Sequence, residues 1–423
     1  MATRLLKEHA GSTTRLMRKA ISGSGSVYGF SVPFEFDVHF TRGVWCVDND
    51  LLARLLAARE PDRRHRLLVV IDEHVADAHP SLPARIAAYC AARPSTLELL
   101  SQPLIVPGGE AVKNGWTRCL GVLERINELG VDRQSFIVVI GGGAVLDMVS
   151  FAAAIAHRGV RVVRMPTTVL SQADSGIAVK NSVNLFGKKN FIGTFAPPFA
   201  VINDLDFLRS LDRRERIAGV SEAVKVALLR DPVFFAFLES YVAEIAVGDP
   251  DVMAHVVQRS AELHLAHICG NGDPFELGSA RPLDFGHWAA HKLESMTAHR
   301  VRHGEAVAVG MALDLAYSVL KGFLPQTTCE RILGLLEAVG LPLFDDALME
   351  RTSNGDYSIV SGLREFREHL GGDLHITLLR DIGASFEVTE MDDALVAEAI
   401  AAVARRALPH RLSVPIGTAA GAW

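Results

Sequence analysis

The 423-residue chain lacks several features that would place it in particular classes of protein. Its five cysteines form no close pair, which argues against a thiolate metal site and favours a reducing compartment, the cytoplasm. No apolar run is long enough to span a bilayer, so we expect no membrane segment. The formal net charge of −6 gives no basis for binding nucleic acid through bulk positive charge. The sequence also shows no internal repeat.

The composition, with 49% hydrophobic and 22% charged residues, is that of a globular protein long enough for two domains. We expect an N-terminal extension at 1–30, an α/β domain at 31–208, a helical domain at 209–407 and a tail at 408–423. Residues 1–21 hold five basic residues against one acid, a pattern that a transit peptide shares. We interpret this stretch as a basic, partly helical extension.

The first half of the chain alternates strand patterns with helical patterns. Continuous β-rich runs, typical of buried parallel strands, lie at 66–72 and 135–140, with an exposed strand pattern at 34–40 and shorter candidates at 160–164 and 200–204. Helical patterns lie between them at 83–93, 115–129 and 144–157. This order predicts a doubly wound parallel sheet, whose ligands bind beyond the carboxyl ends of the strands.

A glycine-rich turn follows the strand that ends at Ile140. Gly141, Gly142 and Gly143 permit a tight turn whose N–H groups approach a pyrophosphate at a helix N-terminus. The full dinucleotide motif is absent, because Leu146 stands where its last glycine would be, and such turns also occur without a ligand. Asp72, at the end of an earlier strand, is a candidate contact for ribose or adenine, or else a helix N-cap.

A dense run of polar residues between 172 and 190 fits neither a helical nor a strand period. Its lysines would neutralise a phosphate, and its Asp and Asn residues would hold hydroxyl groups. The interleaved apolar residues indicate a packed segment rather than a solvated loop, which is the alternative. The polar members are Gln172, Asp174, Lys180, Asn181, Asn184, Lys188, Lys189 and Asn190.

The second half is helical in pattern almost throughout, and it contains a cluster of histidines. His287 and His291 are four residues apart and share a helix face, and His303 precedes a second apolar helix. A helix–turn–helix would bring His287 and His303 together, and Glu222 would supply a carboxylate. Two histidines, one carboxylate and an open position are a common catalytic zinc site. The alternative is surface histidines or satisfied core histidines.

Eight blocks of sequence, in order, resemble the dehydroquinate synthase-like sugar phosphate cyclases. They are Gly141-Gly-Gly with Asp147; Arg158-Gly159; Pro166-Thr-Thr; Asp174 with Lys180; Gly187-Lys-Lys-Asn190; Glu222 with Lys225; Phe285-Gly-His287; and His303-Gly-Glu305. The resemblance implies an NAD-binding α/β domain, an all-α metal-binding domain and a homodimer. The implied reaction is transient oxidation by NAD⁺, loss of phosphate, return of the hydride and intramolecular aldol closure.

The resemblance also implies roles for individual residues. The ligands of Zn²⁺, or of Co²⁺, would be Glu222, His287 and His303. The cofactor contacts would be Asp72, Glu110, Lys113, Gly142, Gly143, Asp147, Thr167, Thr168 and Lys189, with Asp174 beside them. The contacts to a sugar phosphate substrate would be Arg158, Asp174, Lys180, Asn190, Lys225 and His291.

Departures from the pattern bear on the substrate. His264 stands where dehydroquinate synthases carry Lys, Asp284 stands where they carry Asn, and Arg281 is out of register with their Arg. Because an aspartate repels a carboxylate and accepts hydrogen bonds from hydroxyls, we expect a substrate without the acid group. The sequence around Phe285 is similar to that of the sedoheptulose 7-phosphate cyclases, which make 2-epi-5-epi-valiolone or 2-epi-valiolone. The alternatives are a 3-dehydroquinate synthase, a glycerol dehydrogenase-like oxidoreductase and a catalytically silent NAD-binding scaffold.

Overall fold

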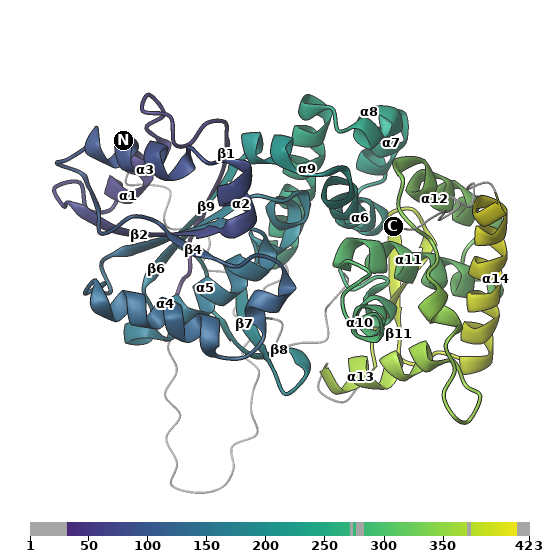
Figure 1. Cartoon of the computed structure of the whole chain (residues 1–423). Coiled ribbons are helices and arrows are strands. Elements are labelled where there is room, and N and C mark those ends of the chain that lie inside the picture. Colours follow the sequence, from purple (N-terminus) through teal and green to yellow (C-terminus); the bar gives the residue numbers. More distant parts are fainter. Residues whose placement is uncertain (1–31, 271–273, 276–282, 370–373, 413–423) are drawn as a thin grey trace, which may run out of the picture. The chain divides into compact units, whose positions relative to one another are not determined.

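The computed structural model describes residues 32–270, 274–275, 283–369 and 374–412 (Figure 1). Those from Glu35 onward form one compact unit. The expected extension at 1–30, Arg281 and most of the expected tail lie outside the described residues, although the last helix continues into the tail as far as Leu412. Within the described part of the chain, no helix combines the length and the apolar character needed to cross a membrane.

The first half forms a parallel sheet with strand order β1-β9-β6-β5-β2-β3, in which β4 also pairs with β2. This confirms the predicted doubly wound fold. The three-residue strands β3 and β4 were not predicted, because so short a run shows no period. The strands are β1 (Asp37–Thr41), β2 (His65–Asp72), β3 (Leu97–Leu99), β4 (Leu104–Val106), β5 (Phe136–Gly141), β6 (Arg161–Pro166) and β9 (Ala200–Asp204).

The central strands are apolar at successive positions because helices cover both faces of the sheet. In β2, Leu67, Val69 and Ile71 pack with α1 (Leu51–Ala57) and α3 (Leu82–Ala91). Leu68 and Val70 point to the other face, toward α4 (Thr117–Glu128) and α5 (Gly143–Ile155). The short helix α2 (Glu73–Ala78) follows β2. Burial on both faces places the carboxyl ends of β2, β5 and β6 side by side, where the predicted cofactor turns begin.

The polar run at 172–190 is not the loop that its lack of period indicated. A single π-helical turn, Ser171–Ser175, leads into an antiparallel hairpin of β7 (Lys180–Leu185) and β8 (Lys188–Phe195). Val183 and Ile192 pack this hairpin on the α5 side of the sheet. The pattern concealed the strands because buried positions of β7 include Asn181 and Asn184, so apolar alternation is lost.

The second half is the expected helical domain, and it also contains a two-stranded antiparallel sheet (Figure 1). The strands are β10 (Ile376–Asp381) and β11 (Ala384–Val388). The helices are α6 (Arg213–Arg230), α7 (Pro232–Ser240), α8 (Val242–Val247), α9 (Pro250–Gly270), α10 (His287–Met296), α11 (His303–Leu320), α12 (Gln326–Val339), α13 (Ser361–His369) and α14 (Asp393–Leu412).

Helix α11 lies unusually close to two neighbouring segments. A Cβ atom on Gly304 would lie 1.9 Å from the carbonyl oxygen of Ala218 in α6. A Cβ atom on Gly310 would lie 2.0 Å from the carbonyl oxygen of Gly286, in the turn before α10. Gly286 itself has a φ of 77°, which disfavours any residue with a side chain. Backbone contact at these glycines therefore sets the spacing of α6, α10 and α11.

We expect Gly310→Ala to lower the free energy of unfolding by about 1–3 kcal/mol, because its methyl group cannot fit without moving α11. Denaturant unfolding of the purified protein measures this. Gly334→Ala in α12 is the matched control, since nothing lies within 4 Å of its Cβ position. The control should stabilise the protein by about 0.5–1 kcal/mol. Equal effects of the two substitutions would contradict the packing argument.

Candidate active site

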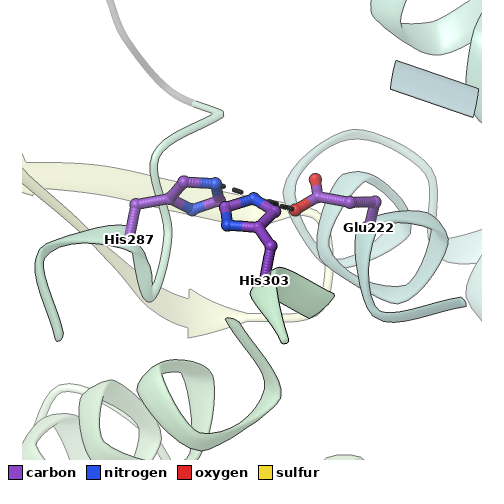
Figure 2. Close-up of side chains that lie close together, drawn as sticks. All are labelled: Glu222, His287 and His303. Atoms are coloured by element: carbon purple, nitrogen blue, oxygen red, sulfur yellow. Dashed lines mark ion pairs between the residues drawn. The ribbon is translucent and has the colours of Figure 1, made fainter. Parts of the chain in front are cut away.

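Three predicted metal ligands meet at the starts of two helices and the middle of a third (Figure 2). His287 is the first residue of α10, His303 is the first residue of α11, and Glu222 lies within α6. Glu222 Oε1 is 3.7 Å from His287 Nε2 and 3.8 Å from His303 Nε2. One ligand atom from each of the three lies within 4.8 Å of the others. The helix–turn–helix arrangement expected from the histidine spacing is present.

The surrounding hydrogen bonds orient this cluster as a metal site requires. His287 Nδ1 lies 3.1 Å from the carbonyl oxygen of Phe285, which can only accept, so Nδ1 donates and Nε2 of the neutral ring is free to ligate. Glu222 Oε1 is buried and accepts no hydrogen bond from the residues that the structure describes. A buried carboxylate oxygen without a donor is costly unless a cation lies beside it. The residues therefore fit a divalent metal bound by nitrogen and oxygen ligands, such as Zn²⁺.

Burial and nearby charges shift the pKa values of His287 and Lys225 in opposite directions. Burial, with the nearby Lys225 charge, lowers the pKa of His287 well below its ordinary value. Lys225 Nζ lies 2.5 Å from Glu222 Oε2, and both side chains are buried. Burial alone would lower the pKa of Lys225, but Glu222, Asp174 and Asp284 outweigh it and raise that pKa. The ammonium group of Lys225 thus lies beside Glu222, the carboxylate predicted to bind the metal.

The side chains of two predicted substrate residues from different halves of the chain contact each other. His264 Nε2, on α9, lies 2.9 Å from Asp174 Oδ1, in the π-helical turn. Burial alone would raise the pKa of Asp174, but His264 and Lys225 hold it below its ordinary value. Asp174 is therefore an ionised acceptor at neutral pH.

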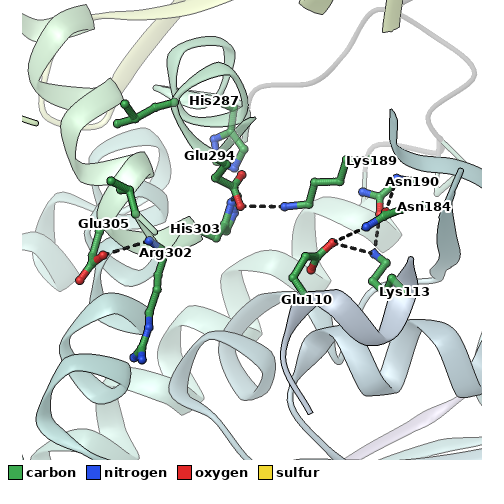
Figure 3. A network of polar contacts seen from close by, with 12 residues as sticks. Glu110, Lys113, Asn184, Lys189, Asn190, His287, Glu294, Arg302, His303 and Glu305 are labelled. Atoms are coloured by element: carbon green, nitrogen blue, oxygen red, sulfur yellow. Dashed lines mark hydrogen bonds and ion pairs between the residues drawn. The ribbon is translucent and has the colours of Figure 1, made fainter. Parts of the chain in front are cut away.

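Glu294 is a member of the site that sequence reasoning missed (Figure 3). Its Oε2 lies 3.0 Å from His303 Nδ1, and its Oε1 accepts a 2.8 Å hydrogen bond from Lys189 Nζ. Burial would raise the pKa of Glu294, yet His303 and Lys189 hold it well below its ordinary value. Spacing offered one signal, since Glu294 lies seven residues after His287, on the same face of the helix.

A cavity of about 660 Å³ lies where the carboxyl ends of the strands approach the helical domain. Gly142 caps α5 there, so the N–H groups of that helix start face the cavity. Asp72 caps α2, accepting a 2.9 Å hydrogen bond from the His74 amide, so the N-cap interpretation is confirmed. Asp72 also lines the cavity, and its contact with a cofactor stays a prediction. The predicted cofactor contacts that line it are Asp72, Glu110, Gly142, Gly143, Thr167, Thr168 and Lys189, and they are joined by Glu294, Arg302 and His303.

Other predicted cofactor residues bind one another instead of lining this cavity. Lys113 Nζ donates to Asp147 Oδ2 at 2.7 Å and to Asn190 Oδ1 at 2.5 Å. Asn190 also accepts from Ser182 Oγ at 2.9 Å. Asn190, expected among the substrate contacts, thus has its side chain bound to Lys113, a predicted cofactor residue. A role of Asn190 in substrate binding stays a prediction.

Arg158 does not reach the site within one chain. It follows the last turn of α5 and precedes β6, at the amino ends of the strands, whereas the glycine turn is at their carboxyl ends. The 13 residues of α5 separate the two by roughly 20 Å. Arg158 is exposed, with a φ of 64° in the left-handed region. Of the remaining expected substrate residues, His291 is exposed near His287 and His303, and Lys180 begins β7.

A buried arginine holds the segment that joins Asp174 to Lys180. Arg164, on β6, is fully buried and donates to the carbonyl oxygens of Ala178 at 2.6 Å and Lys180 at 3.0 Å, with a longer contact to Gly176. Its Nε donates to Ser150 Oγ at 3.0 Å. Burial lowers the pKa of Arg164 to about 10, which leaves it charged at neutral pH. This clasp was not predicted, because one arginine in an apolar strand carries no sequence signal.

Comparison with known proteins places this architecture in a family. Residues 103–218 match the model of the 3-dehydroquinate synthase N-terminal family, and residues 219–354 match that of the 3-dehydroquinate synthase C-terminal family. The 3-dehydroquinate synthase of Cereibacter sphaeroides is 36% identical over 340 residues, covering 79% of this chain and 88% of that protein. The one from Halorhodospira halophila is 37% identical over 296 residues, covering 67% and 81%.

Among solved structures, 2-epi-5-epi-valiolone synthase from Streptomyces hygroscopicus subsp. jinggangensis, with NAD⁺ and Zn²⁺ bound, superposes with a TM-score of 0.77 and 26% identity, covering 90% of this chain and 100% of that chain. A probable glycerol dehydrogenase from Sinorhizobium meliloti gives a TM-score of 0.57 at 18% identity, covering 88% and 97%, a likeness of fold alone. Fold and site define a sugar phosphate cyclase of the dehydroquinate synthase-like class. The chain belongs to the 3-dehydroquinate synthase family.

Replacing Arg164 by Met should release the segment between Asp174 and Lys180, because buried carbonyl groups lose their donors. We expect the free energy of unfolding to fall by about 3 kcal/mol. Amide hydrogen exchange should accelerate within residues 176–180. Ser150→Ala, which removes one acceptor of Arg164 and keeps the carbonyl contacts, should leave that exchange unchanged. Unaltered exchange in Arg164→Met would refute the clasp.

Proposed function

We propose that this chain is a sugar phosphate cyclase that uses NAD⁺ and Zn²⁺ to convert sedoheptulose 7-phosphate into 2-epi-5-epi-valiolone or 2-epi-valiolone, with release of phosphate. The carrying observation is the charge around Lys225. Three carboxylates, Glu222, Asp174 and Asp284, all raise its pKa, so a further carboxylate on the substrate would meet negative charge. A substrate carrying hydroxyl groups finds acceptors there instead.

The positions that differ from dehydroquinate synthases support the same substrate. His264 stands at the position of their Lys, and its Nε2 is already paired with Asp174 at 2.9 Å. Asp284, at the position of their Asn, lies close enough to Lys225 to affect its pKa. Both substitutions remove affinity for an acid group, which sedoheptulose 7-phosphate lacks.

The residues divide the proposed chemistry between them. Glu222, His287 and His303 would hold Zn²⁺, which would supply polarisation of the hydroxyl being oxidised, and the Gly142–Gly143 turn would hold NAD⁺, which would supply reversible hydride transfer. Lys225 supplies positive charge beside the reacting hydroxyl, and Lys180 neutralises the phosphate. Asp174, held ionised by His264, accepts hydrogen bonds from substrate hydroxyls.

The second candidate is 3-dehydroquinate synthase, which the 36% identity to the Cereibacter sphaeroides enzyme favours. An oxidoreductase of the glycerol dehydrogenase type would accumulate NADH with a polyol, and a silent scaffold would bind zinc without turnover. The lysines of the site argue against the oxidoreductase, because a plain polyol needs no phosphate contacts. The presence of all three expected metal ligands argues against the silent scaffold.

We also propose that the protein is a cytoplasmic homodimer. The homodimer follows from the family resemblance, and light scattering on the purified protein measures it. All five cysteines are free, as expected in a reducing compartment.

Incubation with sedoheptulose 7-phosphate, NAD⁺ and Zn²⁺ should release inorganic phosphate and yield one cyclitol, with no net NADH, because the hydride returns to the product. Phosphate release and NMR of the product measure this, and the coupling constants distinguish the two epimers. A chelator should stop the reaction, and added Zn²⁺ should restore it. Turnover of the carboxylated precursor of 3-dehydroquinate alone would reject the proposal in favour of the second candidate.

Asp284→Asn should shift the preference between these two substrates. Loss of one charged hydrogen bond lowers kcat/KM for sedoheptulose 7-phosphate by about 10- to 100-fold, since such bonds contribute about 1.5–3 kcal/mol. Relative turnover of the carboxylated precursor should rise, because one repelling charge is gone. Asp62→Asn, in an exposed turn, is the control and should change neither value. An unchanged preference in Asp284→Asn would show that Asp284 does not select the substrate.

A further inference from the structure

The carboxylate of Glu294 joins two parts of the site that serve different ligands. One oxygen lies 3.0 Å from Nδ1 of His303, whose other ring nitrogen faces the metal position. The second oxygen accepts from Lys189 Nζ at 2.8 Å. Glu294 is 3% exposed, so its carboxylate is shielded from solvent. Figure 3 shows the contact between Lys189 and Glu294, with His303 beside Glu294.

The three residues come from different elements but line one cavity. Lys189 lies on β8, Glu294 on α10 and His303 on α11. All three line the cavity that Gly142 and Gly143 also line. Glu110 and Asp147 also attract Lys189, but the carboxylate that receives its hydrogen bond is Glu294. The position of the Lys189 ammonium group in the cavity is therefore set from the helical domain.

We propose that Glu294 is a positioning residue that couples the metal site to the dinucleotide site, so that each ligand tightens the binding of the other. The inference rests on the use of Zn²⁺ and NAD⁺ proposed above, and not on the identity of the sugar phosphate.

The coupling follows from the order in which side chains lose freedom. A metal on His303 Nε2 fixes the imidazole ring, and the ring then fixes Glu294 through Nδ1. Glu294 in turn holds Lys189 in the cavity where the dinucleotide binds. A dinucleotide that arrives second meets a lysine already ordered, and the entropic cost of ordering it no longer opposes binding. Linkage makes the effect reciprocal.

The Lys113–Asp147–Asn190 group is a separate network. Hydrogen bonds connect Lys113, Asp147, Ser182 and Asn190, and within the part of the chain that the structure describes these four side chains do not contact the metal ligands. Variants of Lys189 and Glu294 thus act on the proposed link and leave that second cluster in place.

The experiment measures the dissociation constant of NAD⁺ for the metal-free and the Zn²⁺-loaded protein by calorimetry. In the parent protein, Zn²⁺ should tighten NAD⁺ binding at least about fivefold. Lys189→Met should weaken NAD⁺ binding in both forms and bring the ratio between them close to one. Glu294→Gln should also bring this ratio close to one. Competition with a chelator should show that the affinity of this variant for Zn²⁺ falls by about 10- to 100-fold.

Lys292→Met is the matched control, because it removes another lysine–glutamate pair of the same helix, the 2.5 Å contact with Glu365, away from the cavity. It should keep the parent ratio. A ratio near one in the parent protein, or an unchanged ratio in Lys189→Met, would overturn the coupling while leaving cofactor use intact. Failure to bind Zn²⁺ or NAD⁺ at all would instead overturn the proposed function, and the coupling with it.

Discussion

The close approach of α11 to its neighbours is the constraint on which the site depends. Gly304 lies against the carbonyl of Ala218, one helical turn before Glu222, and Gly310 lies against the carbonyl of Gly286, the residue before His287. Gly304 itself follows His303. Each metal ligand is thus within about one turn of a point where backbone touches backbone, and small residues there bring three side chains from three helices to one point.

Buried charges then form a continuous system around that point. Glu222 contacts Lys225, His303 contacts Glu294, and Glu294 contacts Lys189. On the substrate side, Asp174 is held by His264. Each carboxylate in this series has a basic side chain within hydrogen-bonding distance, which offsets the cost of burying it. The arrangement gives the α/β half and the helical half polar contacts that pass through the site itself.

Much of the fold and the metal site could be predicted from the sequence. Runs such as 66–72 are apolar at successive positions because both faces of the sheet are buried. The histidines at two helix starts converge because their helices pack against each other. The β7–β8 hairpin was hidden because its inward positions are partly Asn and Ser. In the sequence, Glu294 could not be told from a surface glutamate of a helix, because the residue type alone does not report burial.

The roles that the resemblance implies for Arg158 and Asn190 stay predictions, and the structure adds where each residue lies. Arg158 matches a motif, and the length of α5 places it at the amino ends of the strands, at the opposite end from the glycine turn. Asn190 matches as well, yet its side chain binds Lys113. A motif reports which residue stands at a position, whereas contacts depend on how the elements pack.

The two histidine ligands stand at the first positions of α10 and α11, and this has an electrostatic consequence. A helix start carries about half a positive charge, and the two starts lie at the metal position. The site also holds the carboxylates of Glu222, Asp174 and Glu294. The backbone itself supplies part of the compensating positive charge, so a phosphate ester meets a field closer to neutral than the carboxylates alone imply.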